Sequence, residues 1–323
     1  MNWNAFNLIS PAISKTKKRV FPFKFKEWLN LVIISSLAKT GSNFTSFNYG
    51  SDISSGSVNQ NFSEALREGI KKYWVIGGII FFILFVLISV LNYIQSVFSF
   101  IFIENLVENK KAKYTFKKNN SKGVSLFLFN FIFSVISLIL IAALVSPYIY
   151  YLMKAEPVIQ SIGIPYLLFS VFAFVIYFIF LSLLFLIISD FVVPYMYKKE
   201  VSVSSGLKQI WKVMTKHKKE SFVYLFSKIL LSLVVGFIIL IIFLIALVAL
   251  ALSALVFLLV GWLIFQLIGG FSVLVILGAL IALILVIIFI VAVFLAIMPL
   301  SVFLEYFALM NFEKLTKLKI INF

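Results

Sequence analysis

The sequence predicts an all-α polytopic membrane protein, a helical bundle with about six spans arranged as three hairpins and with both termini inside. Three observations lead to this prediction. The chain is 63% hydrophobic and only 12% charged, with a mean hydropathy of +1.11, whereas a soluble domain is about half apolar and a quarter charged. Its apolar residues form long uncharged runs, such as 74–91 and 229–298, and a span needs about 20 apolar residues. Lysine-rich clusters separate these runs, as in cytoplasmic loops.

Four basic clusters set the predicted topology. When all four lie inside, each interval between two clusters must cross the membrane an even number of times. The chain is then predicted to be one integral domain of the cytoplasmic membrane over residues 1–323. The predicted segments are the basic cytoplasmic N-terminus 1–26, the polar external loop 39–72, the basic cytoplasmic loops 108–123 and 198–220, and the cytoplasmic C-terminus 305–323.

The first hairpin pairs the run 27–38 with the run 74–103. The run 27–38 is short for a span, so a re-entrant helix, an interfacial helix or a cleaved signal peptide are alternatives. The loop between the two runs is rich in Ser, Asn and Gly, which predicts flexible chain. It contains two N-x-S/T glycosylation acceptors, at Asn43 and Asn61, a motif that also arises by chance in such sequence. Ser63 is expected to cap a short helix that leads into the second run.

The second hairpin pairs the runs 124–145 and 166–188, and the third lies within 222–298. The third interval holds too much apolar sequence for two spans and little room for four. We expect two long helices with an extra half-helix or hairpin over 253–270, broken at Gly261 and at the pair Gly269–Gly270.

An aspartate stands at the end of one apolar run, in the segment ISDFVVPYMYKK at 188–199. Asp190 precedes a lysine pair by about 12 Å of helix, which places it near the inner interface. Pro194 is expected to kink the helix and free backbone carbonyls. Lys228 has a comparable depth on the next run. Together Asp190 and Lys228 predict either an inner vestibule that binds an ion, a proton or a lipid headgroup, or a structural ion pair.

Further polar residues enter the spans. Glu305 follows Pro299 near the inner end of the last run. Asn92 and Gln95 are three residues apart and share one helix face, which predicts interhelical hydrogen bonds or, alternatively, a polar permeation path. A Ser-x-Phe pattern recurs at 96, 189 and 301, near the inner ends of the three returning runs.

The segment SSGLKQIWKVMTKHKK at 204–219 predicts a basic amphipathic helix. An apolar stripe of Leu207, Ile210, Trp211 and Met214 is expected to face away from a stripe of Lys208, Lys212 and Lys216, with Ser205 as the cap. Such a helix lies on an anionic inner leaflet. It serves either as a simple anchor or in lipid regulation or protein docking.

Composition also argues against several classes of function. The chain has no cysteine and one histidine, His217, so we expect no thiolate chemistry, no metal site and no cofactor. It contains no P-loop, G-x-S-x-G or H-E-x-x-H motif, so an enzyme is not expected. The net charge of +16 is confined to the ends of apolar runs, which predicts membrane lipids as partners and no nucleic acid.

Three stretches resemble a known kind of membrane module. They are RVFPFKFKEWLNLVIISSLA at 19–38, the second run ending in SVFSFIFIENL, and SDFVVPYMYKKEVSVSSGLKQIWKVM at 189–214. These residues resemble a family of uncharacterised six-span proteins from archaea and bacteria, which is similar to the membrane domain fused to some glycerophosphodiester phosphodiesterases. The resemblance implies a membrane module without the catalytic domain, with Asp190 and Pro194 as family features.

The function that these observations favour is a non-enzymatic multi-pass module for lipid handling or membrane organisation. Such a module predicts a lateral opening near Lys208, Lys212 and Lys228. The alternatives are a small-solute transporter or channel, which predicts a continuous polar cavity, and a membrane subunit that docks a partner protein. Small residues along 246–253 could pack a homo-oligomer or another membrane protein.

Overall fold

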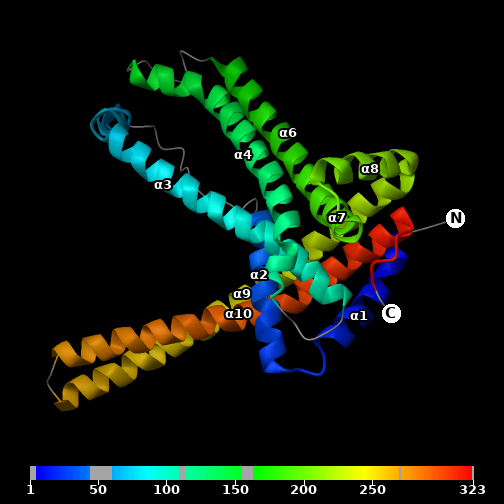
Figure 1. Ribbon diagram of the computed structural model, residues 1–323. Helices are drawn as coiled ribbons and strands as arrows, with labels where there is room; N and C mark the ends of the chain where they lie inside the picture. Colours follow the sequence, from blue (N-terminus) through cyan, green and yellow to red (C-terminus); the bar gives the residue numbers. More distant parts are fainter. Residues whose placement is uncertain (1–4, 44–59, 109–113, 155–162, 269–270, 322–323) are drawn as a thin grey trace. The chain divides into compact units, whose positions relative to one another are not determined.

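The computed structural model describes residues 5–43, 60–108, 114–154, 163–268 and 271–321, and the regular structure there is helical (Figure 1). This confirms the all-α class. The helices are η1 (Ala5–Leu8), α1 (Ile9–Val20), α2 (Phe25–Asn43), α3 (Gln60–Val107), α4 (Phe116–Met153), α6 (Ile164–Ile187), the π-helical segment η3 (Ile188–Val192), α7 (Val193–Lys199), α8 (Val203–Lys216), α9 (Lys218–Ile268) and α10 (Phe271–Thr316).

Five helices in the described part of the chain are long and apolar enough to cross a membrane. Their spanning portions are Lys72–Val107, Phe116–Tyr151, Ile164–Lys199, Lys218–Val256 and Ile281–Thr316. Each exposes a long run of large apolar side chains, as lipid-facing helices do, since hydrocarbon surroundings reward no apolar burial. The chain is therefore a multi-pass integral membrane protein. The sixth span and the side on which each terminus lies stay predictions.

Helix α2 contains the short first run but is not among the five. Leu31, Val32 and Ile34 are buried on it, so this side packs against protein. The Trp28 indole donates to the carbonyl of Val20 at 2.7 Å, which ties the start of α2 to the end of α1.

Two predicted boundaries were wrong. Helix α3 begins at Gln60 and continues without a break, so Ser63 lies inside the helix and is not its cap. Helix α9 is continuous through Gly261 to Ile268, so the extra half-helix does not form. One glycine costs a helix only about 1 kcal/mol, whereas a break in lipid would leave backbone groups unpaired. Residues 44–59 of the predicted loop and the pair Gly269–Gly270 lie outside the described residues.

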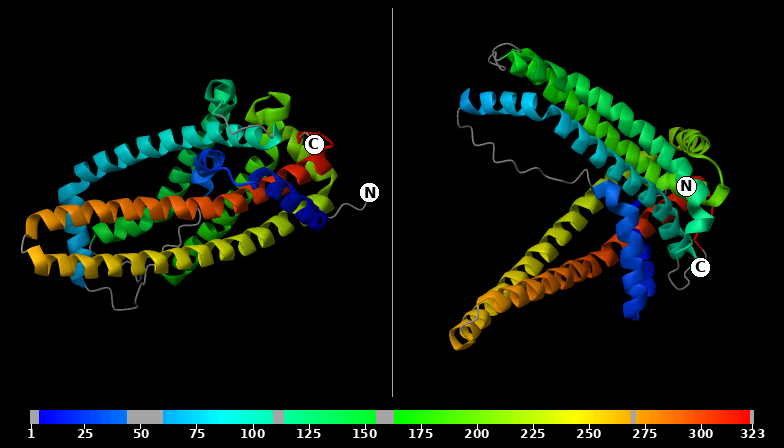
Figure 2. Two further views of the ribbon diagram at one scale, coloured as in Figure 1. Left: turned by 90° about the horizontal axis from the view of Figure 1, so that it is seen from below. Right: turned by 60° about the vertical axis from the view of Figure 1, so that its left-hand side comes forward.

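The chain divides into two compact units. The first contains residues 1–36, 102–114 and 210–323, and the second contains 37–101 and 115–209. In the first, α9 and α10 run side by side (Figure 2), and α1 packs against α10. The rings of Tyr224 and Phe307 stack 6.0 Å apart, and the Tyr306 hydroxyl donates to the carbonyl of Leu106 at 3.1 Å. These interactions join α9, α10 and the end of α3 into one core.

The second unit is built on α3, α4, α6 and α7. Here α4 and α6 are joined along their length by tyrosine hydroxyls: Tyr177 donates to Ser137, Tyr166 donates to the carbonyl of Leu144, and Tyr148 shares a hydrogen bond with Ser170. Each tyrosine is half-buried and its hydroxyl finds a partner, which suits a helix pair in lipid. The pair α4–α6 is therefore a firm hairpin.

Candidate functional site

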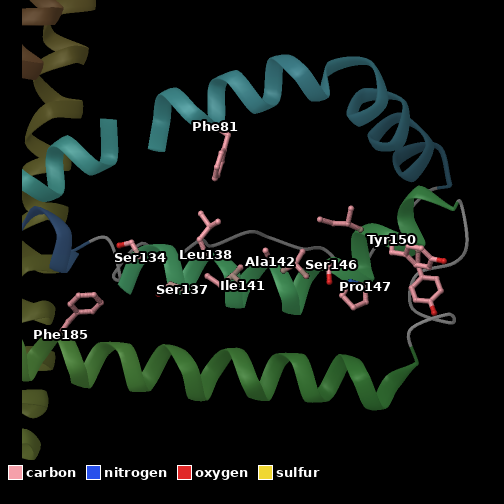
Figure 3. Close-up of a pocket in the computed structure, with 13 residues that line it drawn as sticks. Phe81, Ser134, Ser137, Leu138, Ile141, Ala142, Ser146, Pro147, Tyr150 and Phe185 are labelled. Carbon is pink, nitrogen blue, oxygen red and sulfur yellow. The ribbon is translucent and has the colours of Figure 1, made fainter. Parts of the chain in front are cut away.

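A groove of about 1310 Å³ lies in the second unit beside α4. Its lining comes from α4, with Phe81 of α3 and Phe185 of α6 at its edges (Figure 3). The lining residues are Phe81, Ser134, Ser137, Leu138, Ile141, Ala142, Val145, Ser146, Pro147, Ile149, Tyr150, Tyr151 and Phe185. Its walls are mostly aliphatic and aromatic side chains, so the groove suits an apolar occupant.

Helices α3 and α4 are in close contact before the groove-lining part of α4, which begins at Ser134. The two helices touch closely at Gly123, where an added Cβ would lie 2.9 Å from the Cα of Val97. Beside this point, the Tyr93 hydroxyl donates to Oδ1 of Asn120 at 2.6 Å, and its ring meets Phe127 edge-on at 5.8 Å. These interactions hold α3 against α4, and among the α3 side chains that the structure describes, Phe81 lines the groove.

The serine hydroxyls in the lining already have acceptors. Ser134 donates to the carbonyl of Asn130 at 2.9 Å, and Ser137 donates to that of Phe133 at 2.7 Å. Ser146 donates to the carbonyl of Ala143 at 2.9 Å. A bound molecule does not need to offer polar partners to these three groups, so the lining behaves as an apolar surface.

Pro147 explains the bond made by Ser146. Proline has no N–H, so the carbonyl four residues earlier, that of Ala143, loses its helical donor. The Ser146 hydroxyl replaces that donor. Serine side chains commonly satisfy the carbonyls that proline frees in membrane helices. Proline therefore shapes the groove wall without leaving an unpaired carbonyl in lipid.

Asp190 lies in the π-helical segment Ile188–Val192 and is buried. Pro194, which was predicted to kink the helix, follows this π-helical segment directly after Val193. Without an N–H on Pro194, the carbonyl of Asp190 has no regular helical donor, and the N–H of Val193 bonds one residue further back, to Ile188. A π segment of this kind is frequent at functional positions, so Asp190 stays a candidate.

Lys228 and Glu305 are both buried in the first unit. The Lys228 ammonium donates to the carbonyl of Leu304 at 3.1 Å, which links α9 to α10. Asp190 belongs to the second unit, so the predicted pairing of Asp190 with Lys228 stays a prediction. Glu104, near the C-terminal end of α3, is buried as well.

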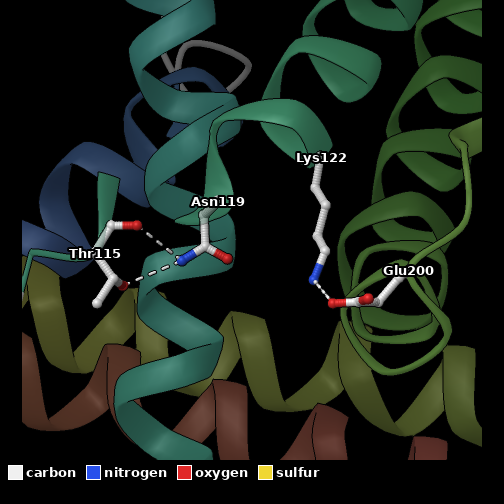
Figure 4. A network of polar contacts seen from close by, with 4 residues as sticks. All are labelled: Thr115, Asn119, Lys122 and Glu200. Atoms are coloured by element: carbon white, nitrogen blue, oxygen red, sulfur yellow. Dashed lines mark hydrogen bonds and ion pairs between the residues drawn. The ribbon is translucent and has the colours of Figure 1, made fainter. Parts of the chain in front are cut away.

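A polar network anchors the turn after α7 (Figure 4). Lys122 of α4 forms an ion pair of 3.0 Å with Glu200, and its ammonium lies 5.4 Å from the centre of the Tyr197 ring. The hydrogen bond from Lys122, and then its positive charge, hold the pKa of Glu200 below the ordinary 4.5. The network also includes Asn119, which donates to both oxygens of Thr115.

Helix α8 is confirmed, but one of its faces differs from the prediction. Ile210 and Met214 are buried as expected, whereas Trp211 is 62% exposed and shares the exposed side with Lys208 and Lys212. Ser205 is not the cap, because the helix begins at Val203. The periodicity could not decide this, since Trp211 lies at the border of the apolar stripe.

The remaining predicted positions fall on helices. Asn92 and Gln95 are half-buried on α3, where their backbone carbonyls accept the hydroxyls of Ser96 and Ser99. Asn43 is the last residue of α2, and Asn61 lies in the first turn of α3. Among the described residues, no group of three or more His, Cys, Asp or Glu could hold a metal ion.

Sequence reasoning missed the groove. None of Asp190, Lys228, Glu305, Lys208 or Lys212 lines it. The available signal was the pair Ser146–Pro147 in an apolar run, followed by three tyrosines, a pattern typical of a bent helix end at a membrane interface.

The five long apolar helices in the described residues are those of a multi-pass membrane protein, and one of them carries an apolar groove. The chain belongs to a family of unknown function, DUF7544, whose model matches residues 3–318. No curated protein and no solved structure matches the chain. The resemblance to the membrane domain of glycerophosphodiester phosphodiesterases is not part of this match and stays a prediction.

Proposed function

We propose that the chain is a non-enzymatic lipid-binding module of the cytoplasmic membrane that holds an acyl chain in the groove beside α4. The observation that supports this most directly is the groove itself, with a volume of about 1310 Å³ on a helix that is long and apolar enough to cross the membrane. Lipid tails are the most abundant apolar molecules beside such a helix. The surrounding bilayer therefore supplies acyl chains to the groove directly.

The length and polarity of the groove fit an acyl chain. From Ser134 to Tyr151 the lining extends along α4 for about 25 Å, at 1.5 Å per residue, a distance comparable to the roughly 30 Å hydrocarbon core. In the predicted topology, α4 starts at the lysine-rich inner side, so Tyr150 and Tyr151 reach the outer interface, where tyrosine is favoured. An acyl chain along this path would have its polar end beside the tyrosines.

The groove favours lipid over a polar solute. A transporter for a polar molecule needs groups that replace the water lost by its substrate. The hydroxyls of Ser134, Ser137 and Ser146 are instead occupied by helix carbonyls. A transport function would have to use other residues, such as Asp190 or Lys228.

Native mass spectrometry of the protein in mild detergent tests the proposal. Ala142→Phe places a ring in the groove, and Ala143→Phe is its matched control, because Ala143 is the next residue on α4, is also exposed, and does not line the groove. We expect retained phospholipid on the wild type and on Ala143→Phe, and a clear loss on Ala142→Phe. Equal lipid retention by both variants would contradict the proposal.

A further inference from the structure

The junction between α8 and α9 presents an exposed basic and aromatic surface within the first unit. Trp211, Lys212 and Lys216 are exposed on the last turns of α8, and Lys219 and Phe222 are exposed on the first turns of α9. We call these five residues the junction surface. The side chains of Trp211 and Phe222 are 62% and 70% exposed, respectively.

The junction is held rigidly. A single residue, His217, separates α8 from α9. Its N–H donates to the carbonyl of Val213 at 3.0 Å, and its carbonyl accepts the N–H of Ser221 at 2.9 Å. The buried Ser221 hydroxyl also donates to the carbonyl of Met214 at 3.4 Å. The end of α8 therefore has a fixed place beside the start of α9.

The start of α9 marks the edge of the lipid-facing surface. Exposed Phe222, Phe226, Ile229 and Leu233 follow one another at intervals of four, three and four residues, so they form one stripe on α9. The exposed Lys218 and Lys219 come immediately before this stripe. A change from lysine to phenylalanine within one turn is typical of a membrane–water interface.

The lysines of α8 come close in the chain to this boundary. Lys216 is three residues before Lys219, and Lys212 lies one turn further back on α8, next to the exposed Trp211. Lysine attracts anionic headgroups as a compact charge, and tryptophan prefers the headgroup level because its ring is apolar and its N–H is polar. Helical spacing places Lys208 on this side of α8 as well.

We infer that the junction surface binds anionic phospholipid headgroups at the membrane surface. This site is separate from the groove, which lies in the second unit. The interaction is electrostatic, so it weakens as salt increases. An acidic protein segment could also meet the lysines, but the apolar stripe that begins at Phe222 fits lipid tails directly below the headgroups, and this continuity favours the membrane.

The test measures lipid enrichment around the full chain. Wild-type protein is placed in nanodiscs that contain equal amounts of phosphatidylglycerol and phosphatidylcholine, and native mass spectrometry reports which lipids remain bound. Lys212→Gln, Lys216→Gln and Lys219→Gln are combined in one variant. The matched control combines Lys314→Gln, Lys317→Gln and Lys319→Gln, which removes the same charge from three lysines that are also exposed in the first unit.

We expect the wild type and the control to enrich phosphatidylglycerol. In the junction variant, this enrichment should fall by a factor of about five for each lysine removed. Trp211→Ala should lower the enrichment further while leaving the thermal unfolding temperature unchanged, because its side chain is exposed. Equal losses in both triple variants would show a general charge effect and overturn the inference. Absence of enrichment in the wild type would overturn it too. Ala142→Phe should not change the enrichment, which separates this site from the groove.

Discussion

Replacing Gly123 by alanine tests the close approach of α3 and α4. The new Cβ would overlap Cγ2 of Val97 and lie 2.9 Å from the backbone of the same residue. The side-chain atom can rotate away, but the backbone atom cannot, so α3 and α4 must separate locally. Overpacking of this kind costs about 1–3 kcal/mol. Alanine returns about 1 kcal/mol through its better helix propensity, and the expected net loss is therefore about 0–2 kcal/mol.

Gly77→Ala is the matched control for this prediction. A Cβ at Gly77 meets nothing within 4 Å, so only the gain in helix propensity remains, and the variant should be as stable as the wild type or slightly more stable. Thermal unfolding in mild detergent, followed by circular dichroism, measures both variants. Adding Val97→Ala to Gly123→Ala should recover part of the loss, because it removes the overlap with the valine side chain while the valine backbone stays close to the new Cβ.

The result that would refute this reasoning is specific. If Gly123→Ala unfolds at the same temperature as Gly77→Ala, then α3 and α4 do not approach at Gly123 as described.

Other interactions lead to three further outcomes. Glu200→Gln should lower stability at neutral pH, and the difference should vanish as the pH falls below 4.5, because a carboxyl with a lowered pKa stabilises the fold only while it is ionised; a pH-independent difference in the unfolding temperature would contradict this. Ser146→Ala should lower the free energy of unfolding by about 1 kcal/mol, because it leaves the carbonyl of Ala143 unpaired. Ser134→Ala should lower it less, because no proline removes a backbone donor there. Equal unfolding temperatures of the two variants would refute this prediction. Oε1 of Glu313 accepts the backbone N–H groups of residues 320 and 321, both at 2.6 Å. Glu313→Gln weakens these charge-assisted hydrogen bonds and should speed amide hydrogen exchange at the two residues roughly tenfold. Unchanged exchange rates would argue against these bonds.

The class of protein and many helix ends follow from local sequence. Unbroken apolar runs predict spanning helices, because a bilayer accepts only chain whose backbone groups are paired internally. The unusual backbone near Asp190 is also local, since the missing N–H of Pro194 disturbs the carbonyl four residues earlier. The break expected at Gly261 failed for the opposite reason, because glycine keeps its N–H and weakens a helix without ending it.

The tertiary structure alone decided where helices approach and where they part. The exposed position of Trp211 depends on which side of α8 packs against the protein, and a ring at the border of the apolar stripe can lie on either side. The close approach of Gly123 and Val97 brings together two residues on different helices that no periodicity connects. The sequence by itself determined that the chain enters lipid, because hydropathy acts residue by residue. Which apolar surfaces meet and which stay open was decided by packing, because in lipid every helix face is apolar and only the shapes of the side chains distinguish one face from another.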